Sequence, residues 1–187
     1  MVTLTSLWLA ILLSAVLVFV VSSIVHMVLK YHKDDFRRFP DEEAVRRALG
    51  PLNIPPGDYA VPYAGSMEAM KSPEYTAKLN EGPVLHATVM PNGPFALGAQ
   101  LAQWFLFSVL VSVFAAYVAS RTLDVGTDYL TVFRITGTVA FAGYALGDLP
   151  QSIWYKRGWG ATVRSMFDGL LYALVTAGVF GWRWPSM

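Results

Sequence analysis

The sequence predicts an all-α integral membrane protein in which four transmembrane helices form a bundle, with a small α+β extramembrane cap between helices 1 and 2. The first observation is composition: 55% of the 187 residues are hydrophobic and 14% are charged, whereas an average soluble domain carries about 25% charged residues. The second is charge placement, because 17 of the 27 charged residues fall between Lys30 and Glu81. The flanking stretches are long, apolar and nearly free of charge, which is typical of membrane proteins.

The first transmembrane helix is predicted from about Leu4 to Leu29, within the apolar segment 1–29. This run is longer than the roughly 20 residues that a helix needs to cross hydrocarbon. A cleaved signal peptide would need a positive n-region, an apolar core of about 7–15 residues and a small-residue cleavage site, and the segment shows none of these. We therefore expect an uncleaved helix. Its polar residues Ser14, Ser22 and His26 share one row and are expected to face the other helices.

Residues 30–94 form the polar segment that is predicted to fold as the cap, with eight Lys and Arg and nine Asp and Glu. A helix over 41–49 is predicted because it begins with an aspartate at the N-cap and is followed by Gly-Pro. A second helix over 72–81 begins with Ser-Pro-Glu, the order that favours a helix start. Two apolar runs bounded by Pro and Gly, 58–63 and 84–90, are predicted to be short strands that pair.

The other three transmembrane helices are predicted within residues 95–187. Helix 2 covers about 95–120, at the end of a stretch that lacks charged residues. Helix 3 covers about 129–149, and Pro150 is expected to end it because the residue before a proline disfavours the helical conformation. Helix 4 covers about 161–182 and follows a loop of aromatic and basic residues suited to the headgroup layer.

Small residues recur at every fourth position on these helices and predict faces for close helix packing. These packing residues are Gly169, Ala173, Ala177 and Gly181 on helix 4, Ser108, Ser112 and Ala116 on helix 2, and Gly143 and Gly147 on helix 3. A four-helix bundle has room to use all of these faces internally. They therefore permit a homo-oligomer or a larger membrane complex without requiring one.

The distribution of Lys and Arg next to the helix ends predicts the orientation of the chain in the membrane. More of these residues flank the side that holds the cap and the loop before helix 4 than flank the opposite side. We expect a multi-pass protein of the cell (inner or plasma) membrane, with the cap in the cytoplasm and both termini outside. Trp8, Trp182 and Trp184 then fall at the outer interface, where tryptophan is enriched.

A row of polar residues on helix 4 supplies the candidate ligand or ion site. Arg164, Asp168 and Tyr172 are spaced four residues apart, beside the stripe of small residues. A charged side chain at the bilayer centre costs about 2.5–3.5 kcal/mol on insertion scales, and Asp168 is expected roughly 10 Å inside the boundary at the helical rise per residue. Asp148 and His26 are expected at similar depth, so the five residues are predicted to form one polar cluster.

Two interpretations of this cluster remain open at the level of sequence. In the functional one, Asp168 titrates in a proton or cation site, or lines a polar pocket for a headgroup or a quinone-like ligand. In the structural one, the same side chains pair and fix the register of the helices. Arg164 has two candidate partners, Asp168 and Asp148.

Motifs that would assign a chemical reaction are missing from the sequence. Cysteine is absent, which excludes disulfides and thiolate metal sites. No metal site is predicted because His32 and His86 lack the spacing of metal ligands, and no haem is predicted because His26 has no second intramembrane histidine. No basic run is interleaved with aromatic residues, so nucleic acid is not an expected partner. Phosphate-loop, zinc-protease and nucleophile-elbow patterns are also absent, and neither a catalytic residue nor a cofactor is predicted.

The leading functional hypothesis is a non-catalytic polytopic membrane protein that acts as an accessory or scaffolding subunit, or as a small ligand-binding bundle. The alternative is a small proton- or cation-coupled transporter that works as an oligomer, because four short helices leave little room for a pathway within one chain. A lipid-active membrane enzyme is the third hypothesis. The partner that the composition itself requires is the lipid bilayer.

Overall fold

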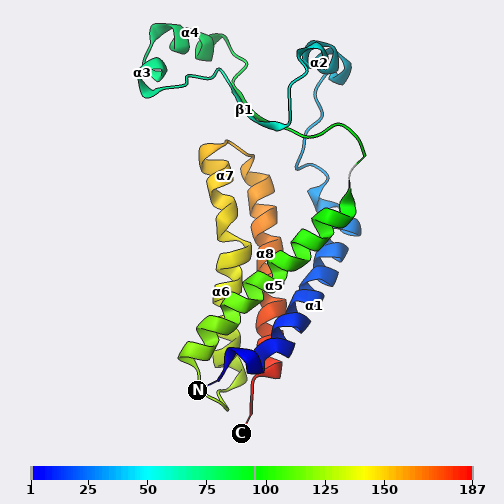
Figure 1. Cartoon of the computed structure of the whole chain (residues 1–187), viewed down its shortest axis with the longest axis vertical. Helices are drawn as coiled ribbons and strands as arrows, with labels where there is room; N and C mark the ends of the chain where they lie inside the picture. The colour runs from blue at the N-terminus through cyan, green and yellow to red at the C-terminus, as the bar shows by residue number, and fades with distance from the viewer. Residues whose placement is uncertain (1, 95, 187) are drawn as a thin grey trace. The chain divides into compact units, whose positions relative to one another are not determined.

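The computed structural model describes residues 2–94 and 96–186, and the chain divides into two compact units (Figure 1). One unit, Met1–Arg37 with Ala96–Met187, holds the long helices and is called the bundle. The other unit, Arg38–Phe95, is called the cap. Residues 30–37, which the sequence pattern groups with the cap, belong to the bundle because the chain turns back onto the last long helix after the first span.

Four stretches of the described chain are long and apolar enough to cross a membrane, which agrees with the predicted number of spans. The first is Leu4–Met27, made of the 3-10 turn η1 (Leu4–Leu7) and the helix α1 (Trp8–Met27). The second is α5 (Leu97–Thr122) and the fourth is α8 (Trp159–Arg183). The third, Tyr129–Trp154, consists of α6 (Tyr129–Tyr144), the 3-10 turn η4 (Leu146–Asp148) and α7 (Leu149–Trp154).

The third span corrects the prediction that helix 3 runs unbroken to a stop at Pro150. The regular helix α6 ends earlier, at Tyr144, and α7 starts beyond the 3-10 turn at Leu149. Pro150 lies in the first turn of α7, where its missing N–H removes no intrahelical hydrogen bond and its fixed φ suits the helix. The proline therefore begins a helix, and the interruption lies just before it.

The four spans pack in a ring (Figure 1), in which α1 and α6 each contact both α5 and α8. The beginning of the first span and the end of α8 lie at one end of the bundle, and α7 and the end of α1 lie at the opposite end (Figure 1). The apolar core at the first of these ends includes Leu7, Val132 and Phe180, each at most 1% exposed. The opposite end is the more polar one and holds the site described below.

Small residues bring α8 close to α6. A Cβ atom added to Gly169 would lie 2.8 Å from Cβ of Ala145 and 3.1 Å from the carbonyl carbon of Tyr144. A Cβ atom added to Gly137 of α6 would lie 3.0 Å from Cβ of Ala177. Both distances are shorter than ordinary carbon–carbon contacts of about 3.5–4.0 Å, so the two backbones approach as closely as these residues allow.

The other small residues named from the sequence differ in their surroundings. Those on α5 and the two alanines of the α8 stripe are buried: Ser108, Ser112, Ala116, Ala173 and Ala177. Gly181 faces the ring of Tyr129, 2.7 Å from where its Cβ would be, and Gly143 faces Val111 at 3.1 Å. Gly147 has open space where a Cβ would be, because it lies in η4, outside the regular helix.

Hydrogen bonds join α1 to α5 across buried positions. The hydroxyl oxygens of Ser14 and Ser112 are 2.9 Å apart, and Trp104 Nε1 donates to Ser22 Oγ over 2.8 Å. Ser14 is fully buried and Ser22 is 4% exposed, so this row of α1 does face a neighbouring helix. In hydrocarbon such polar groups need protein partners, and small hydroxyl residues provide them without separating the helices.

The cap contains short helices, and two of them start after the predicted capping residues. Its helices are α2 (Glu42–Leu49), the 3-10 turn η3 (Gly50–Leu52), α3 (Met67–Met70) and α4 (Pro73–Glu81). Asp41 Oδ1 accepts from the N–H of Ala44, and Ser72 Oγ accepts from the N–H of Tyr75. Each of these side chains satisfies one of the backbone donors that a helix start leaves unpaired.

Two strands of the cap, β1 (Gly57–Val61) and β2 (Leu85–Val89), form an antiparallel pair. Gly57 lies opposite Val89 and Val61 opposite Leu85. The predicted two-stranded pairing is thus present, but the first strand stops at Val61 and does not reach residue 63. The reason is Pro62, which has no N–H to donate to the ladder.

Candidate functional site

The site lies where the chain leaves the first span and turns back onto α8. The helix α1 ends at Met27, and the N–H groups of Val28 and Leu29 both donate to the carbonyl of Ile24, over 2.9 and 3.2 Å. A 3-10 turn, η2 (Lys30–His32), follows directly. This tight turn keeps the next side chains close to the end of α1 and places them against α8.

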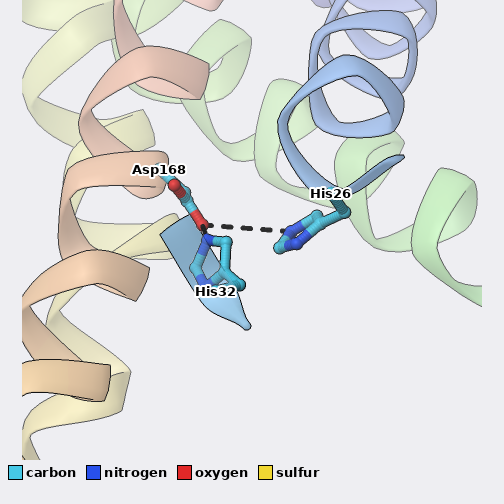
Figure 2. A group of neighbouring side chains, drawn as sticks. All are labelled: His26, His32 and Asp168. Atoms are coloured by element: carbon cyan, nitrogen blue, oxygen red, sulfur yellow. Dashed lines mark ion pairs between the residues drawn. The ribbon is translucent and has the colours of Figure 1, made fainter. Parts of the chain in front are cut away.

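Asp168 of α8 is the centre of the site and is 4% exposed. The Tyr31 hydroxyl donates to its Oδ1. Its Oδ2 lies 2.8 Å from Nε2 of His32 and 3.9 Å from Nε2 of His26. Figure 2 shows these two imidazoles and the carboxylate converging from α1, η2 and α8. The buried carboxylate is therefore held by groups from the other end of the sequence.

A second carboxylate, Asp35, lies on the far side of the His32 ring. Its Oδ2 is 2.7 Å from Nδ1 of His32, and its Oδ1 accepts from Nε and Nη2 of Arg164 over 2.8 and 2.5 Å. Burial alone would raise the pKa of the Asp35 carboxyl, but the hydrogen bonds with His32 and Arg164 outweigh it and hold that pKa below its usual range. Asp35 is thus an ionised acceptor that orients both partners.

His32 lies between the two carboxylates, and its two ring nitrogens differ. Nδ1 lies 2.7 Å from Oδ2 of Asp35, so a proton on this nitrogen is donated to that carboxylate. Nε2 is buried and makes no hydrogen bond within the described part of the chain, although Asp168 Oδ2 is 2.8 Å away. The carboxylate oxygen is close enough for a hydrogen bond but lies off the direction that one requires.

Aromatic groups surround the carboxylate and complete the site. Burial raises the pKa of the Tyr31 phenol, and the hydrogen bond to the Asp168 carboxylate raises it further, so the phenol keeps its proton. The ring of His32 lies 4.4 Å from that of Tyr31 and 4.7 Å from that of His26, centroid to centroid. The Tyr172 hydroxyl is 3.5 Å from Nε2 of His26. These contacts fix the rings around Oδ2 of Asp168.

Three of the five residues named from the sequence gather here: Asp168, His26 and Tyr172. Arg164 reaches the site indirectly, because its guanidinium binds Asp35 and neither Asp168 nor Asp148. Asp148 lies in η4, and no hydrogen bond or ion pair joins it to the other four within the described residues.

Three residues of the site are not among the candidates that the sequence provides: Tyr31, His32 and Asp35. His32 is dismissed as a metal ligand on its spacing, and all three follow the first span directly, in the polar segment that the sequence pattern groups with the cap. The available signal is the spacing of His26 and His32, six residues apart across a helix end. That spacing indicates a shared site only if the chain turns back at residue 30, which the hydropathy pattern does not reveal.

The arrangement suits binding of a cation or a proton. It offers one buried carboxylate oxygen and two imidazole nitrogens in one place, and the His26 side chain is 53% exposed, which leaves a side open to the surroundings. Asp35 and Arg164 add a fixed charge pair behind His32. Comparisons of the chain with protein families, with curated proteins and with solved structures found no match.

Proposed function

We propose that the protein is a non-catalytic multi-pass protein of the cell membrane that binds a small ligand or ion at one end of its four-helix bundle. In this role it acts as a small binding bundle or as an accessory subunit of a larger membrane complex. The observation that carries the proposal is Asp168, a carboxylate that is 4% exposed and is contacted by Tyr31 and His32 from beyond the first span. Buried ionisable groups in membrane proteins mark binding sites and ion pathways.

The geometry favours a site that binds a ligand or ion over a cluster that only links the helices. A purely structural link between η2 and α8 would need only the Tyr31–Asp168 hydrogen bond and the Asp35–Arg164 pair. The site holds more than that, since two imidazole nitrogens also lie 2.8 and 3.9 Å from Oδ2 of Asp168 (Figure 2). One of these rings, His26, is half-exposed and open to an entering ligand.

The orientation that accompanies this proposal follows the distribution of basic residues next to the spans. The end of the bundle that holds the site lies on the cytoplasmic side together with the cap, and both termini lie outside. The site then belongs to the inner leaflet. A ligand would reach it from the cytoplasm or from the headgroup layer.

The test compares wild type with Asp168→Asn in detergent. Asn keeps the shape and the hydrogen-bonding capacity of Asp and removes the charge. A ligand present at 100 times its Kd stabilises the folded protein by about 2.7 kcal/mol. Thermal unfolding is measured with Na⁺, K⁺, Mg²⁺, Ca²⁺, Zn²⁺ or a short-chain quinone, and native mass spectrometry of the purified protein detects bound lipid, pigment or subunit.

We expect at least one of these ligands to raise the unfolding temperature of the wild type, and the increase to be lost in Asp168→Asn. A bound molecule or subunit that is present on the wild type and missing from the variant supports the proposal equally. Equal responses of the two proteins would place binding elsewhere. If the wild type responds to nothing and carries nothing, the proposal is refuted.

A proton- or cation-coupled transporter is the second candidate, and the carboxylate–imidazole–carboxylate chain Asp168–His32–Asp35 favours it. Chains of this kind relay protons in pumps and transporters. The same Asp168→Asn variant distinguishes this candidate from simple binding. In proteoliposomes a transporter dissipates an imposed proton or cation gradient and the variant does not, whereas a binding bundle leaves the gradient intact in both.

A further inference from the structure

Three side chains of the site present metal-binding atoms to one common point. One ring nitrogen of His26, one ring nitrogen of His32 and a carboxylate oxygen of Asp168 all lie within 4.8 Å of one another (Figure 2). They come from the end of α1, from η2 and from α8, so the fold and not a local sequence motif assembles them. Two imidazoles and one carboxylate form a donor set that binds divalent first-row transition metals, with positions left open.

The unusual contact of His32 supports this interpretation. In the tautomer that carries its proton on Nδ1, beside Asp35, the ring has an unprotonated nitrogen at Nε2. In that tautomer Nε2 lies 2.8 Å from Oδ2 of Asp168 with no hydrogen bond between them. Two electron-rich atoms at this separation repel each other unless a positive charge lies between or beside them. A metal ion bound by both atoms supplies that charge.

The distances suit a small metal ion. In a tetrahedral zinc site with bonds of about 2.0–2.1 Å, two ligand atoms lie roughly 3.3 Å apart. The two nitrogen–oxygen distances to Asp168 Oδ2, 2.8 Å from His32 and 3.9 Å from His26, lie on either side of this value. Small side-chain adjustments would bring both to it. The Tyr31 hydroxyl donates a hydrogen bond to the other oxygen, Oδ1, so Oδ2 remains to bind the metal.

The surroundings of His32 match the outer shell of protein metal sites. A metal-bound histidine usually donates its second ring N–H to a carboxylate, which fixes the tautomer and makes the ligating nitrogen more basic. Asp35 is the corresponding carboxylate here, and its Oδ2 lies 2.7 Å from Nδ1 of His32. Arg164 in turn holds Asp35 through two donors. The carboxylate is therefore itself fixed, as outer-shell partners commonly are.

We propose that His26, His32 and Asp168 bind one divalent transition-metal ion of the zinc class at the end of the bundle, with Asp35 orienting His32. This inference rests on the proposed function and names the ligand class for that site. The ion is bound through Nε2 of each histidine and Oδ2 of Asp168. The half-exposed His26 gives it a path of entry and leaves room for a water molecule or a further ligand.

A competing explanation is that a second proton on His32 supplies the positive charge between the two carboxylates. In that case His32 is an imidazolium and the site has no need of a metal. His26 separates the two explanations. It lies 3.9 Å from Asp168 and is half-exposed, so it is a ligand of a metal site but is not needed for the imidazolium between Asp35 and Asp168.

The experiment uses the full chain, purified in detergent and stripped of metal with a chelator. Zn²⁺ binding is measured by competition with a chelating dye, and Co²⁺ is added as a spectroscopic probe whose visible absorption reports nitrogen and oxygen ligation. The variants are His26→Ala, whose side chain is half-exposed, Asp168→Asn and Asp35→Asn. The matched control is His86→Ala, which removes a histidine from the cap.

We expect wild type and His86→Ala to bind one Zn²⁺ per chain with equal affinity and to give the same Co²⁺ spectrum. Asp35→Asn should weaken binding by roughly 10–100-fold, as loss of an outer-shell partner does. His26→Ala and Asp168→Asn remove ligands and should weaken it more. Size-exclusion profiles show which variants fold. If Asp168→Asn does not fold, the Zn²⁺ affinity of His26→Ala decides whether the metal site exists.

Two results would overturn the metal site, and they differ in what they leave standing. If the wild type binds no Zn²⁺ or Co²⁺ but another ligand stabilises it and not Asp168→Asn, the site binds something other than a transition metal and the proposed function remains. If no ligand of any kind binds and nothing co-purifies, both proposals fail. Zn²⁺ binding that is unchanged in a folded His26→Ala also refutes the metal site.

Discussion

Replacing Gly169 by alanine should weaken the bundle, although the same change in an open part of a helix usually strengthens it. The added Cβ would lie 2.8 Å from Cβ of Ala145, 3.1 Å from its Cα and 3.1 Å from the carbonyl carbon of Tyr144. Two of these three atoms belong to backbone, so a change of rotamer cannot relieve the contact. The third span and α8 would have to separate by several tenths of an ångström.

The magnitude follows from two opposing effects. Ordinary carbon–carbon contacts lie at about 3.5–4.0 Å, and inserting a methyl group into a close-packed region costs about 1–3 kcal/mol. Alanine in place of glycine within a helix gains up to about 1 kcal/mol. Because the contact is with backbone, the packing cost lies in the upper part of its range, so the expected net effect of Gly169→Ala is a loss of about 1–2 kcal/mol in the free energy of unfolding.

Two further glycines of α8 serve as matched controls. A Cβ on Gly178 would meet only the Tyr129 hydroxyl, at 3.7 Å, which is an ordinary contact. Gly178→Ala should therefore be neutral or slightly stabilising. A Cβ on Gly181 would lie 2.7 Å from the Tyr129 ring, but that side chain is 47% exposed and can turn aside. Gly181→Ala should cost less than Gly169→Ala.

The assay is thermal unfolding of the purified variants in one detergent, followed by helical circular dichroism and by recovery of monodisperse protein after heating. The order of stability is expected to be Gly178→Ala at or above the wild type, then Gly181→Ala, then Gly169→Ala. If Gly169→Ala were as stable as Gly178→Ala, α8 would not pack against the interrupted third span at this point.

Two other predictions concern orientation and pH. Reporter fusions after Gly82 and after Gly158 should report the cytoplasm and a fusion after Gly126 the exterior, whereas the opposite signals would refute the orientation inferred from basic residues. Asp128 is the N-cap of α6, and its hydrogen bonds from Thr131 lower the pKa of its carboxyl. The ionised carboxyl therefore stabilises the folded protein above the unfolded-state pKa of about 3.9. This stabilisation is lost as pH falls through the lower folded-state pKa. The stability difference between wild type and Asp128→Asn should shrink over that acidic range, and a difference that is constant from neutral pH to strong acid would contradict this reasoning.

Most of the fold could be predicted because its signals are local and strong. The length of each apolar run gives the four spans, and the side chains of Asp41 and Ser72 mark the starts of two cap helices at the residues where the structure has them. The interruption of the third span could not be predicted. Residues 145–148 contain no proline to mark the break, and the close packing of Ala145 against Gly169 joins positions that are distant in sequence.

The site was predictable only where the residues lie inside a span. Asp168 is a candidate from sequence alone because a carboxylate inside a span needs partners. The four-residue spacing on the same helix then identifies Arg164 and Tyr172 as its neighbours. Its actual partners, Tyr31 and His32, lie beyond the end of the first span. Their position depends on a 3-10 turn of three residues, and neither hydropathy nor periodicity carries information about such a turn.

The link between η2 and α8 has a consequence for how the chain closes on itself. The Tyr31–Asp168 hydrogen bond joins residues 137 positions apart, and the Asp35–Arg164 pair joins residues 129 positions apart. The entropy lost in closing a loop grows only with the logarithm of its length, about 0.6 kcal/mol for each doubling. Once the first contact has closed this loop, the second contact requires only the short segment after Tyr31 to be ordered. Each contact therefore lowers the entropy cost of forming the other. The first and last spans should come together in one step.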